Sequence, residues 1–152
     1  MAAFIHVSVQ AGVIDPQGLS AALEKSNLNI GAMASFTGYC RDEGGLLNAL
    51  ELEHYPGMAE AKLKEIANAA VERFGLDALT LVHRYGKLTP GDVIVFVAAL
   101  SRHRDAAFDG ARFVMDYLKT DAPFWKKEHR KDGSTGWVSA KDADDSAKAR
   151  WK

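Results

Sequence analysis

Cysteine is nearly absent from this chain of 152 residues, which contains Cys40 alone. One cysteine allows no internal disulfide, and it excludes the zinc sites that several cysteines build. The five histidines do not show the spacing of metal ligands. We therefore expect neither a metal ion nor a cofactor.

Long hydrophobic runs are absent as well. The most apolar stretch, 93–100, is eight residues long, whereas a helix that crosses a bilayer needs about 20 residues. Residues 1–10 lack the basic start and the apolar run of a secretory signal. These absences indicate a soluble protein of the cytoplasm, without a membrane partner.

No charge of one sign dominates, because 19 Lys and Arg stand against 20 Asp and Glu, for a formal net charge of −1. Such a balance argues against a general nucleic-acid binder. The apolar fraction of 47% is that of an ordinary globular protein. We expect one domain over residues 1–139, followed by a polar and mobile tail over 140–152.

Hydrophobic periodicity and turn residues predict the elements of this domain. Strands are expected at 4–10, 30–40, 46–55, 78–84, 92–100, 124–130 and 135–139, and helices at 16–26, 57–74 and 103–119, with Gly75 ending the second helix and a turn at 87–92. The run 92–100 is almost continuously apolar, which is typical of a central strand. The small apolar residues of 30–40 predict a second buried strand. Several strands follow one another without a helix between them, which favours antiparallel pairing and an α+β fold over a doubly wound α/β fold.

Positive charge gathers between residues 101 and 131, which hold eight basic and five acidic side chains. A solvated helix face explains an arbitrary basic run, but helical geometry favours another interpretation here. In the helix at 103–119, Arg104 and Lys119 lie on the same side as Phe108 and Met115. We infer a pocket lined by an apolar stripe, with a cation at each end, for a small molecule that bears phosphate or carboxylate.

Two further segments add cations to this set. Arg41 directly follows the predicted strand 30–40, and Lys126 and Lys127 lie in the strand 124–130. Successive side chains of a strand point to opposite faces, so one of these lysines faces the pocket whichever face lies inward. Each cation alone would be an ordinary surface residue, whereas together they describe a site for an anionic small molecule.

Two residue types able to carry chemistry have simpler interpretations. Cys40 is the obvious candidate for a nucleophile, yet a lone cysteine at the end of an apolar strand is more often buried packing. His54 and His83 fall in predicted strands, where we expect structural roles.

Four stretches, in order along the chain, resemble the large, catalytic subunit of molybdopterin synthase. They are GAMASFTGYCR at 31–41, LELEHYPGMAEAKLKEI at 50–66, HRYGKLTPGDVIVFVAALSRHRDAAFDGARFVMDYLK at 83–119 and APFWKKEHRKDGSTGW at 122–137. The patterns H-R-x-G-x-L-x-x-G-[DE], S-x-H-R-x-x-A-F and P-x-W-K-K-E, occurring in this order, are specific to that family. The resemblance implies an α/β hammerhead with an additional antiparallel β-sheet.

The resemblance also implies an activity and its partners. Members of the family convert cyclic pyranopterin monophosphate (precursor Z) into molybdopterin by installing two dithiolene sulfurs. The sulfur arrives as a thiocarboxylate on the C-terminal glycine of a small ubiquitin-like partner subunit, whose tail enters a pocket of the large subunit. This chain is then a sulfurtransferase that forms the homodimer core of a heterotetramer.

The site residues follow from the same resemblance. By their positions in the matching stretches, substrate binding falls on Tyr39, Cys40, Arg41, His103, Arg104, Lys119, Lys126, Lys127 and Glu128. Lys119 is implied to be the most critical catalytic group, assisted by Lys126, in proton transfer or in charge stabilisation. Family members commonly carry valine where this chain has Cys40, so we expect Cys40 to contribute its backbone and not its sulfur.

Two alternatives stay open at this point. A non-catalytic module that binds a phosphorylated metabolite or an anionic peptide tail explains the basic pocket equally well. An RNA-binding α+β domain needs exposed aromatic residues beside basic ones on a sheet, and no RNP-like run occurs. Thermal stability distinguishes these classes, since a ligand that binds the folded state raises the melting temperature.

Overall fold

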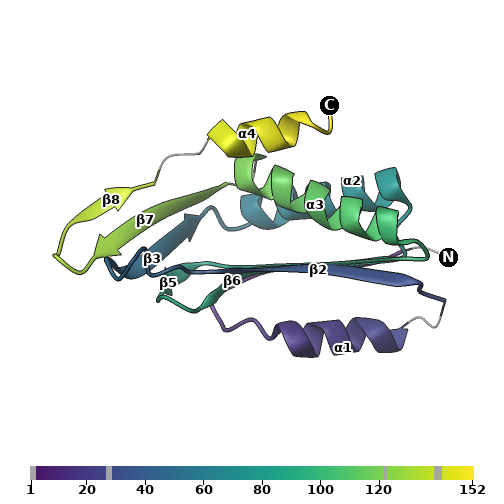
Figure 1. The fold of residues 1–152 in the computed structure, drawn as a ribbon, viewed down its shortest axis with the longest axis horizontal. Coiled ribbons are helices and arrows are strands. Elements are labelled where there is room, and N and C mark those ends of the chain that lie inside the picture. The colour runs from purple at the N-terminus through teal and green to yellow at the C-terminus, as the bar shows by residue number, and fades with distance from the viewer. Residues whose placement is uncertain (1–2, 27–28, 122, 139–141) are drawn as a thin grey trace.

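Two four-stranded sheets and four helices make up the part of the chain that the structure describes (Figure 1). The structure is a computed structural model, and it describes residues 3–26, 29–121, 123–138 and 142–152. In chain order the elements are β1 (Phe4–Gln10), α1 (Pro16–Ser26), β2 (Ala32–Tyr39), β3 (Leu47–His54), α2 (Met58–Phe74), β4 (Ala78–Arg84), β5 (Gly86–Leu88), β6 (Val93–Ser101), α3 (Arg104–Asp121), β7 (Phe124–Arg130), β8 (Thr135–Trp137) and α4 (Asp142–Ala149).

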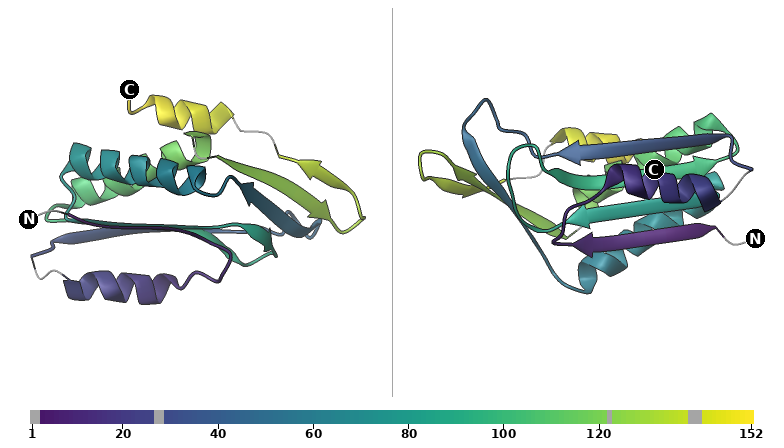
Figure 2. Two further views of the ribbon diagram at one scale, coloured as in Figure 1. Left: turned by 180° about the vertical axis from the view of Figure 1, so that it is seen from behind. Right: turned by 90° about the horizontal axis from the view of Figure 1, so that it is seen from below.

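The first sheet has the strand order β1-β4-β6-β2, with helices on both faces. Helices α2 and α3 cover one face and α1 covers the other (Figures 1 and 2). The central strand β6 is buried on both sides, because alternate residues from Val95 to Ala99 pack beneath α2 and α3, while those from Phe96 to Leu100 pack against α1. This arrangement explains the continuous apolar run and confirms the prediction of a central strand.

The second sheet, with the order β5-β3-β7-β8, is antiparallel throughout. It extends beyond one end of the first sheet (Figure 1). In the first sheet, β4 and β2 pair with β6 antiparallel, and only β1 and β4 pair in parallel. The structure therefore confirms the α+β class with an additional antiparallel sheet. Gly75 ends α2 in a left-handed conformation (φ 64°), as predicted for a glycine after a helix.

The strand at 30–40 differs from the prediction, because β2 is an edge strand and not a buried one. It pairs only with β6, and Phe36 and Tyr39 are 45% and 57% exposed. Its small residues allow close packing against the neighbouring strand, since a Cβ at Gly38 would lie 2.8 Å from Cγ1 of Val95. The small apolar residues of β2 thus allow the strand to approach β6 closely, but they do not indicate that both faces of β2 are buried.

The hairpins also differ in detail from the expected elements. The expected turn at 87–92 begins with the short strand β5, which pairs with β3 and buries Leu88. Strand β8 ends at Trp137, before the predicted end at 139, and residue 139 lies outside the described residues.

The C-terminal segment, expected as a polar and mobile tail, contains the helix α4 at 142–149, which the sequence analysis did not predict. The Trp151 ring packs edge-on against the rings of Phe74 and Phe113, with centroids 5.5 and 5.6 Å apart. Lys148 donates a hydrogen bond of 2.5 Å to the Asp121 carboxylate. These contacts hold the polar segment against α2 and α3. The amino-acid composition of the segment gives no sign of them. Residues 140 and 141 lie outside the described residues.

The length and hydropathy of the helices bear on membrane association. None of the helices in the described ranges combines the length and the apolar character that spanning a bilayer requires.

Candidate active site

A small recess brings together the two lysines that were predicted to be catalytic. Lys119 lies in the last turn of α3 and Lys126 lies on β7. With His83 and Phe124 they surround a cavity of about 40 Å³, whose described lining also includes Val95 and Leu118. Among the described residues, no carboxylate lies within ion-pair distance of Lys119, and the cavity receives two lysine side chains from different elements. The recess is therefore suited to an anion.

His83 forms the floor of this recess on β4. Its side chain is 6% exposed and stacks on Phe124, with ring centroids 4.0 Å apart and an interplanar angle of 17°. Nδ1 lies 2.8 Å from the carbonyl oxygen of Arg84. Burial lowers the pKa of His83 to about 3; the hydrogen bond to Arg84 opposes this in part, and the charges of Lys119 and Lys126 lower the pKa as well. The imidazole is thus neutral at physiological pH.

The alternation of β7 separates the two adjacent lysines. Lys126 shares the face of Phe124 and reaches the recess. Lys127 lies on the opposite face, where its Nζ is 5.6 Å from the centre of the Trp137 ring. Glu128 shares the face of Lys126, but it forms an ion pair of 3.3 Å with Arg130. The structure therefore brings Lys126 to Lys119, and does not place Lys127 or Glu128 in the recess.

Tyr39 ends β2, and Cys40 and Arg41 follow it, at the same end of the first sheet as the recess. Tyr39 pairs with Val93, two positions along β6 from Val95. The Cys40 backbone is held at both ends, since its N–H donates to the Asp92 carbonyl and its own carbonyl accepts from Gly91, both at 2.8 Å. Arg41 is largely exposed and its guanidinium lies 3.3 Å from the Glu43 carboxylate.

The thiol of Cys40 is unsuited to nucleophilic attack. The side chain is 3% exposed. Burial raises the pKa of the Cys40 thiol, and the negative charges of Asp92 and Glu43 raise it as well. The reactive thiolate is therefore scarce at neutral pH. That Cys40 contributes its backbone to substrate binding stays a prediction.

His103 and Arg104 lie at the other end of the first sheet. They follow β6 and begin α3, and both side chains are exposed. Lys119 comes fifteen positions after Arg104, which corresponds to about 22 Å along a helix. Within one copy of the chain, the predicted site is thus divided into two parts.

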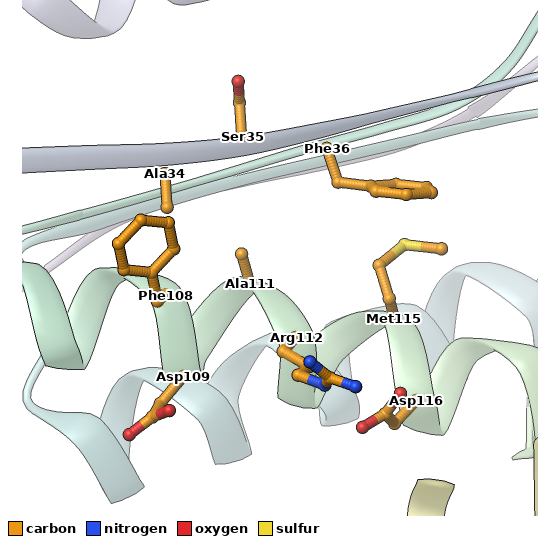
Figure 3. Close-up of a pocket in the computed structure, with 9 residues that line it drawn as sticks. All are labelled: Ala34, Ser35, Phe36, Phe108, Asp109, Ala111, Arg112, Met115 and Asp116. Carbon is orange, nitrogen blue, oxygen red and sulfur yellow. The ribbon is translucent and has the colours of Figure 1, made fainter.

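An open groove of about 540 Å³ lies between these two parts, bounded by β2 and α3 (Figure 3). Phe36 points from β2 toward the helix, and Phe108, Ala111 and Met115 point from α3 toward β2. Asp109, Arg112 and Asp116 also belong to the lining, and the two aspartates point away from β2. Phe108 is 66% exposed. The apolar stripe predicted on this helix does line a cavity, but the cations Arg104 and Lys119 lie beyond its two ends.

Sequence reasoning missed His83 and Phe124 as parts of the site. The available signal was His83 itself, a polar ring at the end of the apolar run ALTLVHR, in a strand that is otherwise buried. Among the residues that the structure describes, no group of three or more histidine, cysteine or carboxylate side chains is arranged to hold a metal ion.

Comparisons with known proteins identify relatives of this chain. The sequence matches the MoaE protein family over residues 9–121. The molybdopterin synthase catalytic subunit of Rhizobium meliloti is 60% identical over 152 residues, covering 99% of this chain and 98% of that protein. The Escherichia coli protein of the same description is 50% identical over 123 residues, covering 80% and 81%.

Solved structures show the same fold. The molybdopterin biosynthesis MoaE protein from Burkholderia ambifaria superposes with a TM-score of 0.83 at 48% identity, covering 97% of this chain and 98% of that one. Molybdopterin synthase from Staphylococcus aureus gives a TM-score of 0.77 at 30% identity, covering 86% and 95%. By its matching sequence and its fold, this chain belongs to the MoaE protein family.

Proposed function

We propose that this chain is the catalytic subunit of a molybdopterin synthase. It converts cyclic pyranopterin monophosphate into molybdopterin, with sulfur from the C-terminal thiocarboxylate of a small ubiquitin-like partner. The observation that carries this proposal is the recess that Lys119 and Lys126 line together, in a chain whose relatives are catalytic subunits of that enzyme.

Both reactants are anions, and this explains the residue types of the site. A cyclic phosphate and a thiocarboxylate repel one another unless cations lie between or beside them. Lys119 and Lys126 supply two such charges in a partly desolvated recess, where they stabilise negative charge better than in water. Arg41, at the same end of the sheet, offers a planar guanidinium suited to phosphate.

We infer that a second copy of the chain completes the site. Within one copy, Arg104 and Lys119 are about 22 Å apart along α3. The midpoint of this distance falls at Ala111 and Arg112, beside the groove between β2 and α3. A two-fold axis at this point would bring Arg104 and His103 of one copy to Lys119 of the other. The exposed Phe36 and Phe108 supply the apolar contact of such an interface. A homodimer of this kind, with a small subunit at each site, makes the heterotetramer.

The proposed reaction belongs in the cytoplasm. Thiocarboxylate and dithiolene sulfurs oxidise readily, and they persist where the surroundings keep thiols reduced.

Reconstitution tests the proposed function. Purified chain is mixed with precursor Z and a thiocarboxylated small subunit, and molybdopterin is followed through its oxidised fluorescent derivative. Lys119→Ala is compared with Lys64→Ala, which removes an exposed lysine from α2 and serves as the matched control. We expect product from the wild type and the control, and almost none from Lys119→Ala. A wild type that binds the partner but makes no product contradicts the proposal and favours a non-catalytic binding module.

A further inference from the structure

We propose that His83 is a positioning residue of this site, whose Nε2 is the acceptor that orients the Lys119 ammonium when that flexible side chain turns into the recess; the structure places the two side chains around one cavity without a hydrogen bond between them. This inference rests on the proposed function and adds a residue to it. His83 and Lys119 line the same cavity of about 40 Å³ from β4 and from the last turn of α3.

The hydrogen bond at Nδ1 fixes the form of the imidazole. A carbonyl oxygen can only accept, so the contact of 2.8 Å with the Arg84 carbonyl requires that Nδ1 carry the hydrogen. A neutral imidazole has one N–H, and Nε2 therefore carries the lone pair. The backbone of β4 thus determines which nitrogen is available as an acceptor.

The surroundings hold the ring still. His83 pairs with Val95 of β6 and Val9 of β1, so its backbone lies in the middle of a sheet. Phe124 stacks on the ring at 4.0 Å, and the side chain is nine-tenths buried. An acceptor that cannot turn is suited to orienting the flexible side chain of a lysine.

Neutrality is what distinguishes His83 from a carboxylate in this place. Its pKa of about 3 keeps the imidazole uncharged across the physiological range. A carboxylate would also hold Lys119, but it would neutralise the charge that the anionic substrates need. A neutral acceptor orients the ammonium and leaves its positive charge for the substrate.

Two isosteric variants separate this role from a packing role. In His83→Asn, the side-chain amide reaches the position of Nδ1 and keeps the hydrogen bond to the Arg84 carbonyl, but no acceptor remains at Nε2. In His83→Gln, the amide reaches the position of Nε2 and restores an acceptor while losing the anchor. His54→Gln is the matched control, because His54 is also near Phe124, with centroids 6.1 Å apart, but does not line the recess.

The readouts are kcat and KM in the reconstituted reaction, with the melting temperature of each variant. We expect His83→Asn to lower kcat by about 10-fold to 100-fold at nearly unchanged KM, because a hydrogen bond to a charged group is lost. His83→Gln should recover most of kcat even if it melts lower, and His54→Gln should match the wild type. Equal kcat values for Asn and Gln, or kcat values that follow the melting temperatures, would overturn the proposal.

A spectroscopic measurement distinguishes failure of this inference from failure of the proposed function. The ¹⁵N resonances of the His83 ring are recorded in the wild type, in Lys119→Ala and in Lys64→Ala, without substrates. We expect a protonated Nδ1 in all three, and an Nε2 resonance that moves toward the value of a free lone pair only in Lys119→Ala. An unchanged Nε2 resonance in Lys119→Ala sinks the contact, whatever the activity of the wild type.

Discussion

Replacing Trp151 by alanine should destabilise the fold, although this residue lies in a segment whose composition is typical of a tail. The ring contacts Phe74 and Phe113 edge-on, and its Nε1–H donates to the Asp116 carboxylate at 2.7 Å. The guanidinium of Arg73 lies 5.5 Å from the ring centre and donates to the Trp151 carbonyl at 2.7 Å. The substitution therefore removes a ring from a packed cluster and a donor from a charged acceptor.

The magnitude follows from these contacts. Truncating a fully buried tryptophan costs about 3–5 kcal/mol, and Trp151 is only partly buried, so we assign about 2 kcal/mol to the ring. Loss of the hydrogen bond to Asp116 adds about 1.5 kcal/mol. At about 3 °C per kcal/mol for a chain of this length, the melting temperature should fall by about 10 °C. Trp151→Phe keeps the edge-on ring and loses the donor, so its melting temperature should lie about 5 °C below that of the wild type.

Thermal unfolding, followed by far-ultraviolet circular dichroism, checks these values. Trp137→Ala is the control, because that ring is 57% exposed and its change should cost no more than about 1 kcal/mol. Equal shifts for the two alanine variants would refute the docking of α4 against α3. We also propose that residues 1–139 fold as one domain, so a chain that ends there should unfold cooperatively, at a lower temperature than the full chain.

Three further predictions concern the site and the C-terminal contact. Cys40→Ala should keep its activity with a loaded partner, and complete loss of activity would count against a backbone role. The wild-type thiol should react slowly with a disulfide reagent at neutral pH, since the pKa of Cys40 is raised. Equal amounts of Arg104→Ala and Lys119→Ala, unfolded and refolded together, should regain about a quarter of wild-type activity, because random pairing makes half the dimers mixed and each mixed dimer has one intact site; no recovery would exclude a shared site. For Asp121, burial opposes ionisation but the hydrogen bond and charge of Lys148 outweigh it and lower the pKa. The stabilisation is then present at neutral pH and is lost as the pH falls below the ordinary carboxyl pKa of 3.8, so Lys148→Ala should melt lower than the wild type at neutral pH and approach it in acid.

The elements that the sequence predicts correctly are those with a strong local cause. The apolar run of β6 has one explanation, burial on both faces, and the glycine at position 75 follows a clear helical repeat. The edge position of β2 depends on which strand pairs with which, and no periodicity within 30–40 encodes that. The helix at 142–149 depends on contacts with α3, more than 20 positions earlier, as in the pair of Lys148 with Asp121.

The candidate site also has a part that the sequence predicts and a part that depends on tertiary packing. Motifs indicate Lys119 and Lys126, and the structure brings these two residues together. Alternation along β7 predicts that Lys126 and Lys127 point apart, but only the packing of Phe124 on His83 determines which one faces the recess. The sequence alone predicts a structural role for His83, because the tautomer and the neighbours of this side chain depend on the folded structure. The separation of Arg104 from Lys119 is calculable from helix rise alone, and it already indicates that one copy does not hold the whole site.

The length of α3 has a consequence for how proteins of this shape can diverge. If Arg104 of one copy and Lys119 of the other serve one substrate, the helix acts as a spacer between two half-sites, and its midpoint fixes where the copies meet. One inserted residue would advance everything after it by about 1.5 Å and rotate it by about 100°, which turns Lys119 away from the recess in both sites at once. Single substitutions along this helix are therefore tolerable, whereas an insertion or deletion between residues 104 and 119 is not. Differences in length between related chains should occur in the glycine-rich loop at 41–45 and beyond residue 121.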